Sequence, residues 1–117
     1  MSTTPNTATP ELTDRDRNVL ANVLRSLLWA LEWAERSDRF QAGVSVGHAQ
    51  GWTYDVSREA KAFIDVLIDL VKTACRASHP KRHVQNAREH LERYAADHGL
   101  TVKRSAHGSV IGVDVPE

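Results

Sequence analysis

Apolar side chains recur at helical spacing over the stretch from Asn18 to Phe40. This period predicts an amphipathic helix, and its recurring positions are Val19, Leu20, Val23, Leu24, Leu27, Leu28, Leu31 and Ala34. Thr13 or Asp14 is expected to cap the first turn of this helix, because short side-chain oxygens accept hydrogen bonds from free backbone amides there. Residues 1–12 contain almost nothing to bury, so we expect a disordered N-terminal tail followed by a single domain over residues 13–117.

The period changes after Gln41, and the new pattern predicts a short β-hairpin. Apolar side chains now alternate with small or polar ones, which is typical of a half-buried strand. The segment from His48 to Gly51 supplies the turn between the two expected strands. The alternating positions are Val44 and Val46 before the turn, and Trp52, Tyr54 and Val56 after it.

Two more helices and a second hairpin are expected in the remaining chain. A broad apolar stripe predicts a buried helix, formed by Ala60, Phe63, Ile64, Leu67, Ile68, Val71, Ala74 and Cys75. Pro80, with Ser78 or His79 as its cap, begins a third helix that Gly99 ends. Alternation over residues 100–102 and 110–115 predicts the second hairpin. The sequence therefore predicts one compact α+β domain in the order α-ββ-α-α-ββ, with the hairpins paired to each other or to a second copy.

The composition is that of an ordinary globular protein and narrows the function only a little. The 117 residues carry 15 basic and 15 acidic side chains, so no overall charge attracts nucleic acid or a membrane surface. A single cysteine, the lack of a secretory signal and the lack of a long apolar run favour a cytoplasmic protein that does not enter a membrane.

A tryptophan pair on the first predicted helix is the strongest functional indication. Trp29 and Trp33 lie four residues apart, so they share a helix face that is separate from the leucine stripe. Tryptophan is enriched at binding hot spots, and we expect Leu24, Leu28, Trp29 and Trp33 to anchor an interface with a second copy or with another protein. The alternative is that Trp52 and the first hairpin cover the pair within one chain.

A basic stretch between residues 73 and 88 suggests a different function. Its outline of helix, short break and helix resembles a helix-turn-helix, and a DNA-binding regulator is the first alternative to the interaction protein. The side chains that could contact nucleic acid are Arg76, Lys81, Arg82, Gln85, Asn86 and Arg88. The neutral net charge weakens this interpretation.

The remaining candidates for chemistry are isolated residues. Cys75 and His79 could form a thiolate–imidazole pair in a small enzyme, but Cys75 belongs to an apolar stripe, where cysteine packs as a small hydrophobe. His83 and His90 are about 10 Å apart along a helix, too far to share one metal ion. We therefore expect no metal and no cofactor.

The preferred prediction from the sequence is a small, non-catalytic protein–protein interaction or regulatory protein. It would form a homodimer through the first helix, because symmetric dimers are the commonest oligomers. A composition this poor in motifs is typical of accessory proteins of bacteria and their phages.

Overall fold

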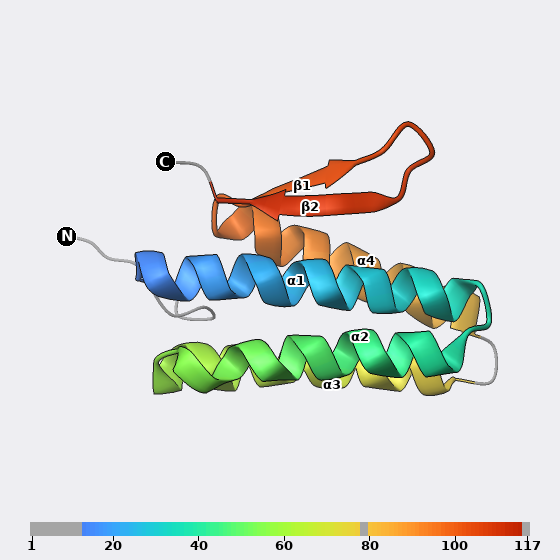
Figure 1. Cartoon of the computed structure of the whole chain (residues 1–117), viewed down its shortest axis with the longest axis horizontal. Coiled ribbons are helices and arrows are strands. Elements are labelled where there is room, and N and C mark those ends of the chain that lie inside the picture. Colours follow the sequence, from blue (N-terminus) through green and yellow to red (C-terminus); the bar gives the residue numbers. More distant parts are fainter. Residues whose placement is uncertain (1–12, 78–79, 116–117) are drawn as a thin grey trace.

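The computed structural model describes residues 13–77 and 80–115, and within them the chain forms four α-helices followed by one β-hairpin (Figure 1). The elements are α1 (Asp14–Glu35), α2 (Arg39–Gly51), a 3₁₀ turn η1 (Trp52–Asp55), α3 (Arg58–Arg76), α4 (Pro80–Asp97), β1 (Thr101–Arg104) and β2 (Val110–Asp114). The predicted single α+β domain is confirmed in outline, but the number of helices and hairpins differs. The predicted tail over residues 1–12 lies outside the described residues.

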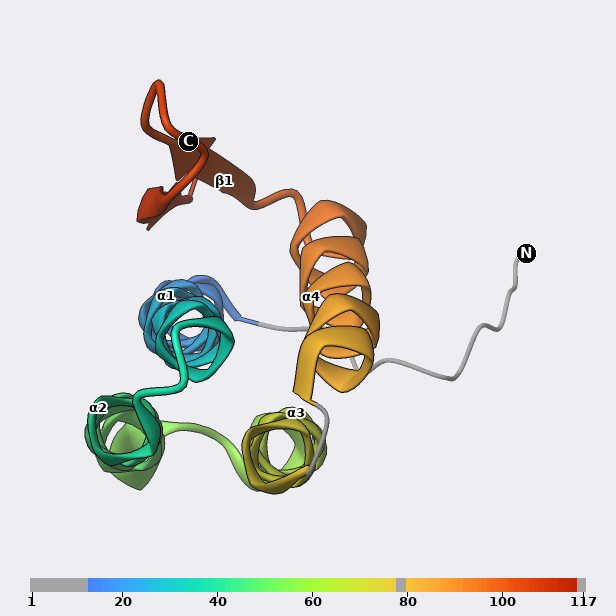
Figure 2. The same cartoon turned by 90° about the vertical axis from the view of Figure 1, so that its right-hand side faces the viewer.

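Helix α1 lies at the centre of the molecule. It contacts α2, α3, α4 and β2, and seen end-on the axes of α1, α2 and α3 lie side by side while α4 crosses them obliquely (Figure 2). The hairpin packs on the side of α1 that faces away from α2 and α3 (Figure 2). This position explains why the apolar stripe of α1 is so broad: four elements of the same chain cover it.

The first helix ends five residues earlier than predicted, at Glu35. Ser37 adopts a left-handed backbone conformation with φ of 63°, which an α-helix cannot continue through. The Asp38 amide donates to the Trp33 carbonyl at 2.9 Å, closing the helix end. Asp38 then caps α2, because its carboxylate accepts from the Gln41 amide at 3.0 Å.

The predicted hairpin over residues 44–56 is wrong, because this segment forms α2 and η1. The buried residues of α2 recur at intervals of three to four, which is helical rather than alternating; they are Ala42, Ser45, Val46 and Ala49. The small alanines carry this period, whereas the more conspicuous Val44, Trp52 and Tyr54 are exposed. With a single hairpin in the described residues, the expected pairing of two hairpins is also wrong.

The boundaries of the last two helices agree well with the sequence. Ser57 caps α3 by accepting from the Ala60 amide at 3.2 Å, and its hydroxyl donates to the buried Asp16 of α1 at 2.7 Å. Helix α4 begins at Pro80 as predicted, and Gly99, with φ of 73°, follows its end. The proposed caps Ser78 and His79 lie outside the described residues.

The C-terminal hairpin is confirmed, and one of its residues, Val110, forms two hydrogen bonds with α1. Strands β1 and β2 are antiparallel, with Thr101 opposite Asp114 and an irregularity between Lys103 and Arg104. The Val110 amide donates to Glu32 Oε2 at 2.8 Å, and the Val110 carbonyl accepts from the Trp29 indole at 2.6 Å. These two bonds position β2 over the exposed side of α1.

Candidate interaction surface

Two of the four predicted interface residues, Leu24 and Leu28, lie in the core of the chain itself. Both side chains are fully buried among residues of the same molecule. Leu24 and Leu28 therefore expose no surface that a partner could contact in the folded chain. The prediction that they anchor an interface is wrong. An amphipathic helix usually buries one side, whereas α1 contacts α2, α3, α4 and β2. The leucines that we predicted at an interface are therefore part of the core.

The other two predicted interface residues, Trp29 and Trp33, are half-buried and pack against the core. Trp29 donates to Val110, so the C-terminal hairpin contacts it, rather than the Trp52 segment that the alternative proposed. Arg25 and Arg36 lie over the rings of Trp29 and Trp33, at 5.3 and 5.5 Å from the ring centres. Both indole rings therefore have contacts within the chain itself that do not involve a partner.

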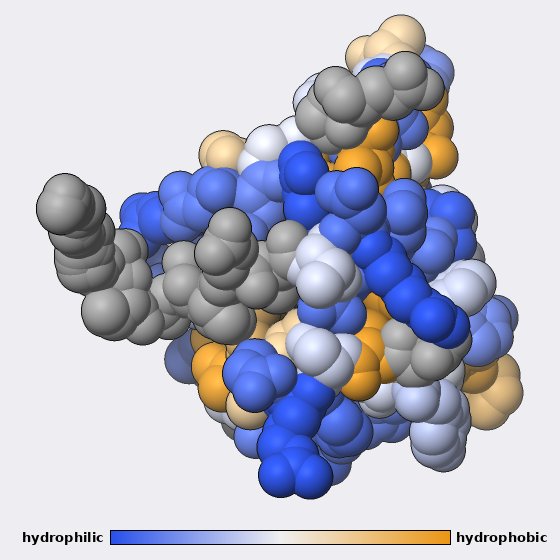
Figure 3. All heavy atoms as spheres, turned by 90° about the vertical axis from the view of Figure 1, so that its left-hand side faces the viewer, coloured by the Kyte–Doolittle hydropathy of each residue, from blue (hydrophilic) through white to orange (hydrophobic). Residues whose placement is uncertain are grey.

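Exposed apolar side chains concentrate instead along α2 and the 3₁₀ turn that follows it. Phe40 is 77% exposed and Tyr54 is 91% exposed, and Val44 is also exposed. Viewed from the end where α1 begins, apolar atoms form separate patches on the hairpin and on the lower layer of α2 and α3, among mostly hydrophilic side chains (Figure 3).

Three glycines share this exposed side of α2. Gly43, Gly47 and Gly51 follow one another at intervals of four residues, and a helix turns by about 100° per residue, so they form one line along it. A Cβ atom added to any of the three would meet nothing within 4 Å. The fold of one chain therefore does not require glycine at these positions.

We call this surface the α2 face, and it is formed by Phe40, Gly43, Val44, Gly47, Gly51 and Tyr54. None of these side chains is charged. A solvated helix side usually carries lysine, arginine, glutamate or aspartate. The α2 face is apolar and smooth, which is typical of a surface that another helix approaches closely.

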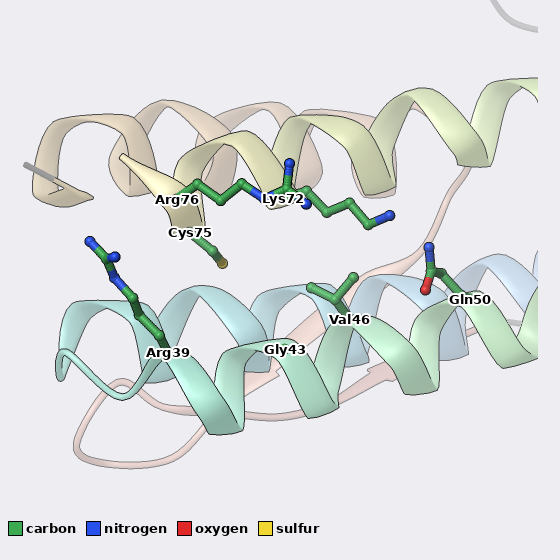
Figure 4. Close-up of a pocket in the computed structure, with 7 residues that line it drawn as sticks. All are labelled: Arg39, Gly43, Val46, Gln50, Lys72, Cys75 and Arg76. Atoms are coloured by element: carbon green, nitrogen blue, oxygen red, sulfur yellow. The ribbon is translucent and has the colours of Figure 1, made fainter. Parts of the chain in front are cut away.

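A pocket of about 460 Å³ opens beside the α2 face, between α2 and the C-terminal end of α3 (Figure 4). Its lining residues are Arg39, Gly43, Val46, Gln50, Lys72, Cys75 and Arg76. The Cys75 thiol points toward α2, and Arg39 and Gln50 lie toward opposite ends of the pocket (Figure 4). No sequence motif pointed to this pocket, because its residues come from two helices, one of which was predicted as strands.

The predicted nucleic-acid region is only partly a free basic surface. Arg76, Lys81 and Arg82 are exposed, as are Gln85 and Asn86. Arg88, in contrast, is bound to Glu35 of α1 at 2.5 Å, and Gln85 donates to the acidic Glu89 at 3.1 Å. Binding of nucleic acid by this region stays a prediction.

The structure adds little support for the predicted catalytic and metal-binding residues. Burial raises the pKa of the Cys75 thiol, which favours the neutral thiol over the nucleophilic thiolate. Its suggested partner His79 lies outside the described residues. His83 and His90 are exposed on α4, and among residues 13–77 and 80–115 no three histidine, cysteine or acidic side chains could hold a metal ion together.

Comparison of the chain with protein-family models, with curated proteins and with solved structures found no match. In the part of the chain that the structure describes, no helix is both long and apolar enough to cross a membrane. The candidate surface is therefore interpreted from its own geometry.

Proposed function

We propose that this chain is a non-catalytic interaction protein that forms a homodimer through the α2 face. The supporting observation is the line of three glycines on an exposed, uncharged side of a helix. An interior glycine destabilises a helix by about 0.5–1 kcal/mol relative to alanine, because it loses more backbone freedom on folding. In one isolated chain nothing offsets this cost, whereas close approach of a second helix would.

The order of residues on the α2 face favours a second copy as the partner. Gly43 and Gly51 lie four residues before and after Gly47, and Phe40 and Tyr54 lie seven residues before and after it. Two such helices packed antiparallel, with a two-fold axis at Gly47, would set glycine against glycine and aromatic ring against aromatic ring. A surface that matches itself in this way is what a symmetric interface requires.

The charge of the α2 face is compatible with this pairing. A symmetric interface sets the same patch of both copies face to face, so a patch that carried one sign of charge would repel itself. The six residues of the α2 face carry no charge and bring no such penalty. A single helix pair buries less than the roughly 1,200 Å² of a stable complex, so we expect a reversible dimer with a dissociation constant in the micromolar range.

Substitution of Gly47 by alanine tests the proposal through two effects of opposite sign. The extra methyl group should raise the stability of the monomer by about 0.5–1 kcal/mol, because nothing in the chain opposes it. The same methyl group should weaken the dimer, and Gly47→Leu should abolish it. Sedimentation equilibrium over a range of concentrations measures association, and urea denaturation at low concentration measures monomer stability.

Ala62→Leu is the matched control, because it adds bulk to an exposed position of α3, away from the α2 face. It should leave the dimer unchanged. A chain that stays monomeric at several hundred micromolar, or a dimer that tolerates Gly47→Leu, would overturn the proposed function.

A further inference from the structure

The pocket between α2 and α3 has an unusual balance of charge. Three of its lining residues, Arg39, Lys72 and Arg76, are cationic, and none is acidic. Lys72 and Arg76 lie four residues apart on α3, so they share one side of that helix, and like charges at this spacing repel each other. Arg39 adds a third positive charge from α2, across the pocket.

These cations are not neutralised by the described part of the chain. Lys72 and Arg76 form no ion pair with any residue of 13–77 or 80–115. Arg39 donates one hydrogen bond, from Nη2 to the Ala77 carbonyl at 3.3 Å. A guanidinium has five N–H donors, so Arg39 keeps others for a ligand.

The rest of the pocket is apolar or neutral. Val46 and the Cys75 thiol lie between the two helices, and Gln50 adds an amide group toward one end (Figure 4). Gly43 leaves room on the α2 side, since a Cβ there would meet nothing within 4 Å. The volume of about 460 Å³ falls within the range of small-molecule sites.

We propose that this pocket binds a small organic anion. A carboxylate or phosphate group would accept hydrogen bonds from Lys72 and Arg76, which suits the preference of guanidinium and ammonium groups for oxyanions. Arg39 points toward the opposite end of the pocket and adds positive charge there (Figure 4). A short apolar segment of the same ligand would lie against Val46 and Cys75. This inference does not depend on the dimer, because the pocket shares only Gly43 with the α2 face.

Titration of the ¹⁵N-labelled full chain with four probes tests the site and separates the two sources of oxyanion. Hexanoate and hexyl phosphate carry the anion and an apolar segment, whereas hexanamide is neutral and hexylamine is cationic. At least one of the two anions should shift the amide signals of residues 39–50 and 72–76 in a saturable way. The neutral and cationic probes should bind at least about tenfold more weakly, because they carry no negative charge to pair with the cationic side chains of the pocket.

A charge-removing variant provides the second arm of the experiment. Lys72→Met keeps the unbranched apolar part of the side chain, removes the ammonium group and should weaken binding of the preferred anion by about tenfold. Lys81→Met, on an exposed position of α4 outside the pocket, is the control and should bind normally. Bound anion should also slow alkylation of the Cys75 thiol in the parent chain.

Three results would overturn the proposal. They are the lack of a saturable shift with either anion, equal binding of hexanamide, and unchanged binding by a folded Lys72→Met chain. Dispersion of the amide spectrum shows whether each variant is folded, so a failure to fold is distinguished from a failure to bind.

Discussion

Asp16 is the residue whose chemistry most directly connects two helices. Its buried carboxylate accepts from the Ser57 amide at 3.1 Å and from the Ser57 hydroxyl at 2.7 Å, and the same hydroxyl caps α3. Burial raises the pKa of Asp16, but its hydrogen bonds with Ser57 and Thr13 outweigh burial and hold the pKa below the usual 3.8. The charged form is therefore the one that stabilises the fold.

Replacement of Asp16 by asparagine should lower the free energy of unfolding at pH 7 by roughly 1–3 kcal/mol, because a buried charged acceptor is lost. The contribution of Asp16 is present above the unfolded pKa and disappears as pH falls through the lower folded value. Urea denaturation at pH 7 and at pH 3 should thus show a smaller loss of stability in acid for the variant than for the parent chain.

The exposed Asp14 is the control for this prediction, since it lies in the same first turn and its side chain is 99% exposed. Asp14→Asn should change the unfolding free energy by less than about 0.5 kcal/mol. Equal effects of the Asp14 and Asp16 variants would show that the buried network is not what stabilises this end of the molecule.

At the scale of elements, apolar packing and two hydrogen bonds hold the hairpin on α1. A two-stranded hairpin is marginal in water, so β1 and β2 need the support of the helices. Val110 is bound on both sides, through its amide to Glu32 and through its carbonyl to Trp29. Trp29 is thus explained by the fold of one chain.

Trp29→Phe should keep the aromatic packing but remove the hydrogen bond to the Val110 carbonyl. We expect it to lower the free energy of unfolding by about 0.5–1.5 kcal/mol and to speed hydrogen exchange at the Val110 amide. Trp33→Phe is the control, because the Trp33 indole N–H donates to no residue in the described part of the chain. Equal exchange rates in the two variants would contradict this role of Trp29.

The outcome of the sequence analysis differed between elements for physical reasons. Large side chains such as those of α3 show the period of a helix clearly, and Pro80 and Gly99 marked the ends of α4 that the structure confirms. Helix α2 was missed because alanine and serine face its core, while its larger residues, such as Phe40, face solvent. Glycine and spacing-two alternation then outweighed the weak helical signal.

The candidate surfaces could not be predicted from the sequence because each depends on an arrangement of helices. The α2 face appears only when residues 39–51 are helical, and the basic pocket appears only when α2 lies beside the end of α3. The spacing of Gly43, Gly47 and Gly51 at intervals of four was nevertheless visible in the sequence. It could have indicated a helix with one side lined by glycine.

On the scale of the whole molecule, the proposed dimer makes the single chain half of a symmetric unit. The core of four helices is complete within one chain, and the apolar stripe of α1 is buried in it, so folding does not require a partner. The α2 face is exposed, uncharged and lined with glycine. Self-association through it would be reversible and would respond to concentration.

The antiparallel register around Gly47 is the central claim, and disulfide crosslinking measures it most directly. Phe40→Cys and Tyr54→Cys are introduced together in a Cys75→Ser chain, and oxidation is followed by non-reducing electrophoresis. The two positions are more than about 20 Å apart along α2 and η1 of one chain, far beyond the roughly 7 Å that a disulfide can span, so they can pair only between chains. We predict a covalent dimer for the double variant and monomers for either single variant, whereas a double variant that stays monomeric, or a Phe40→Cys chain that crosslinks to itself, would contradict the account.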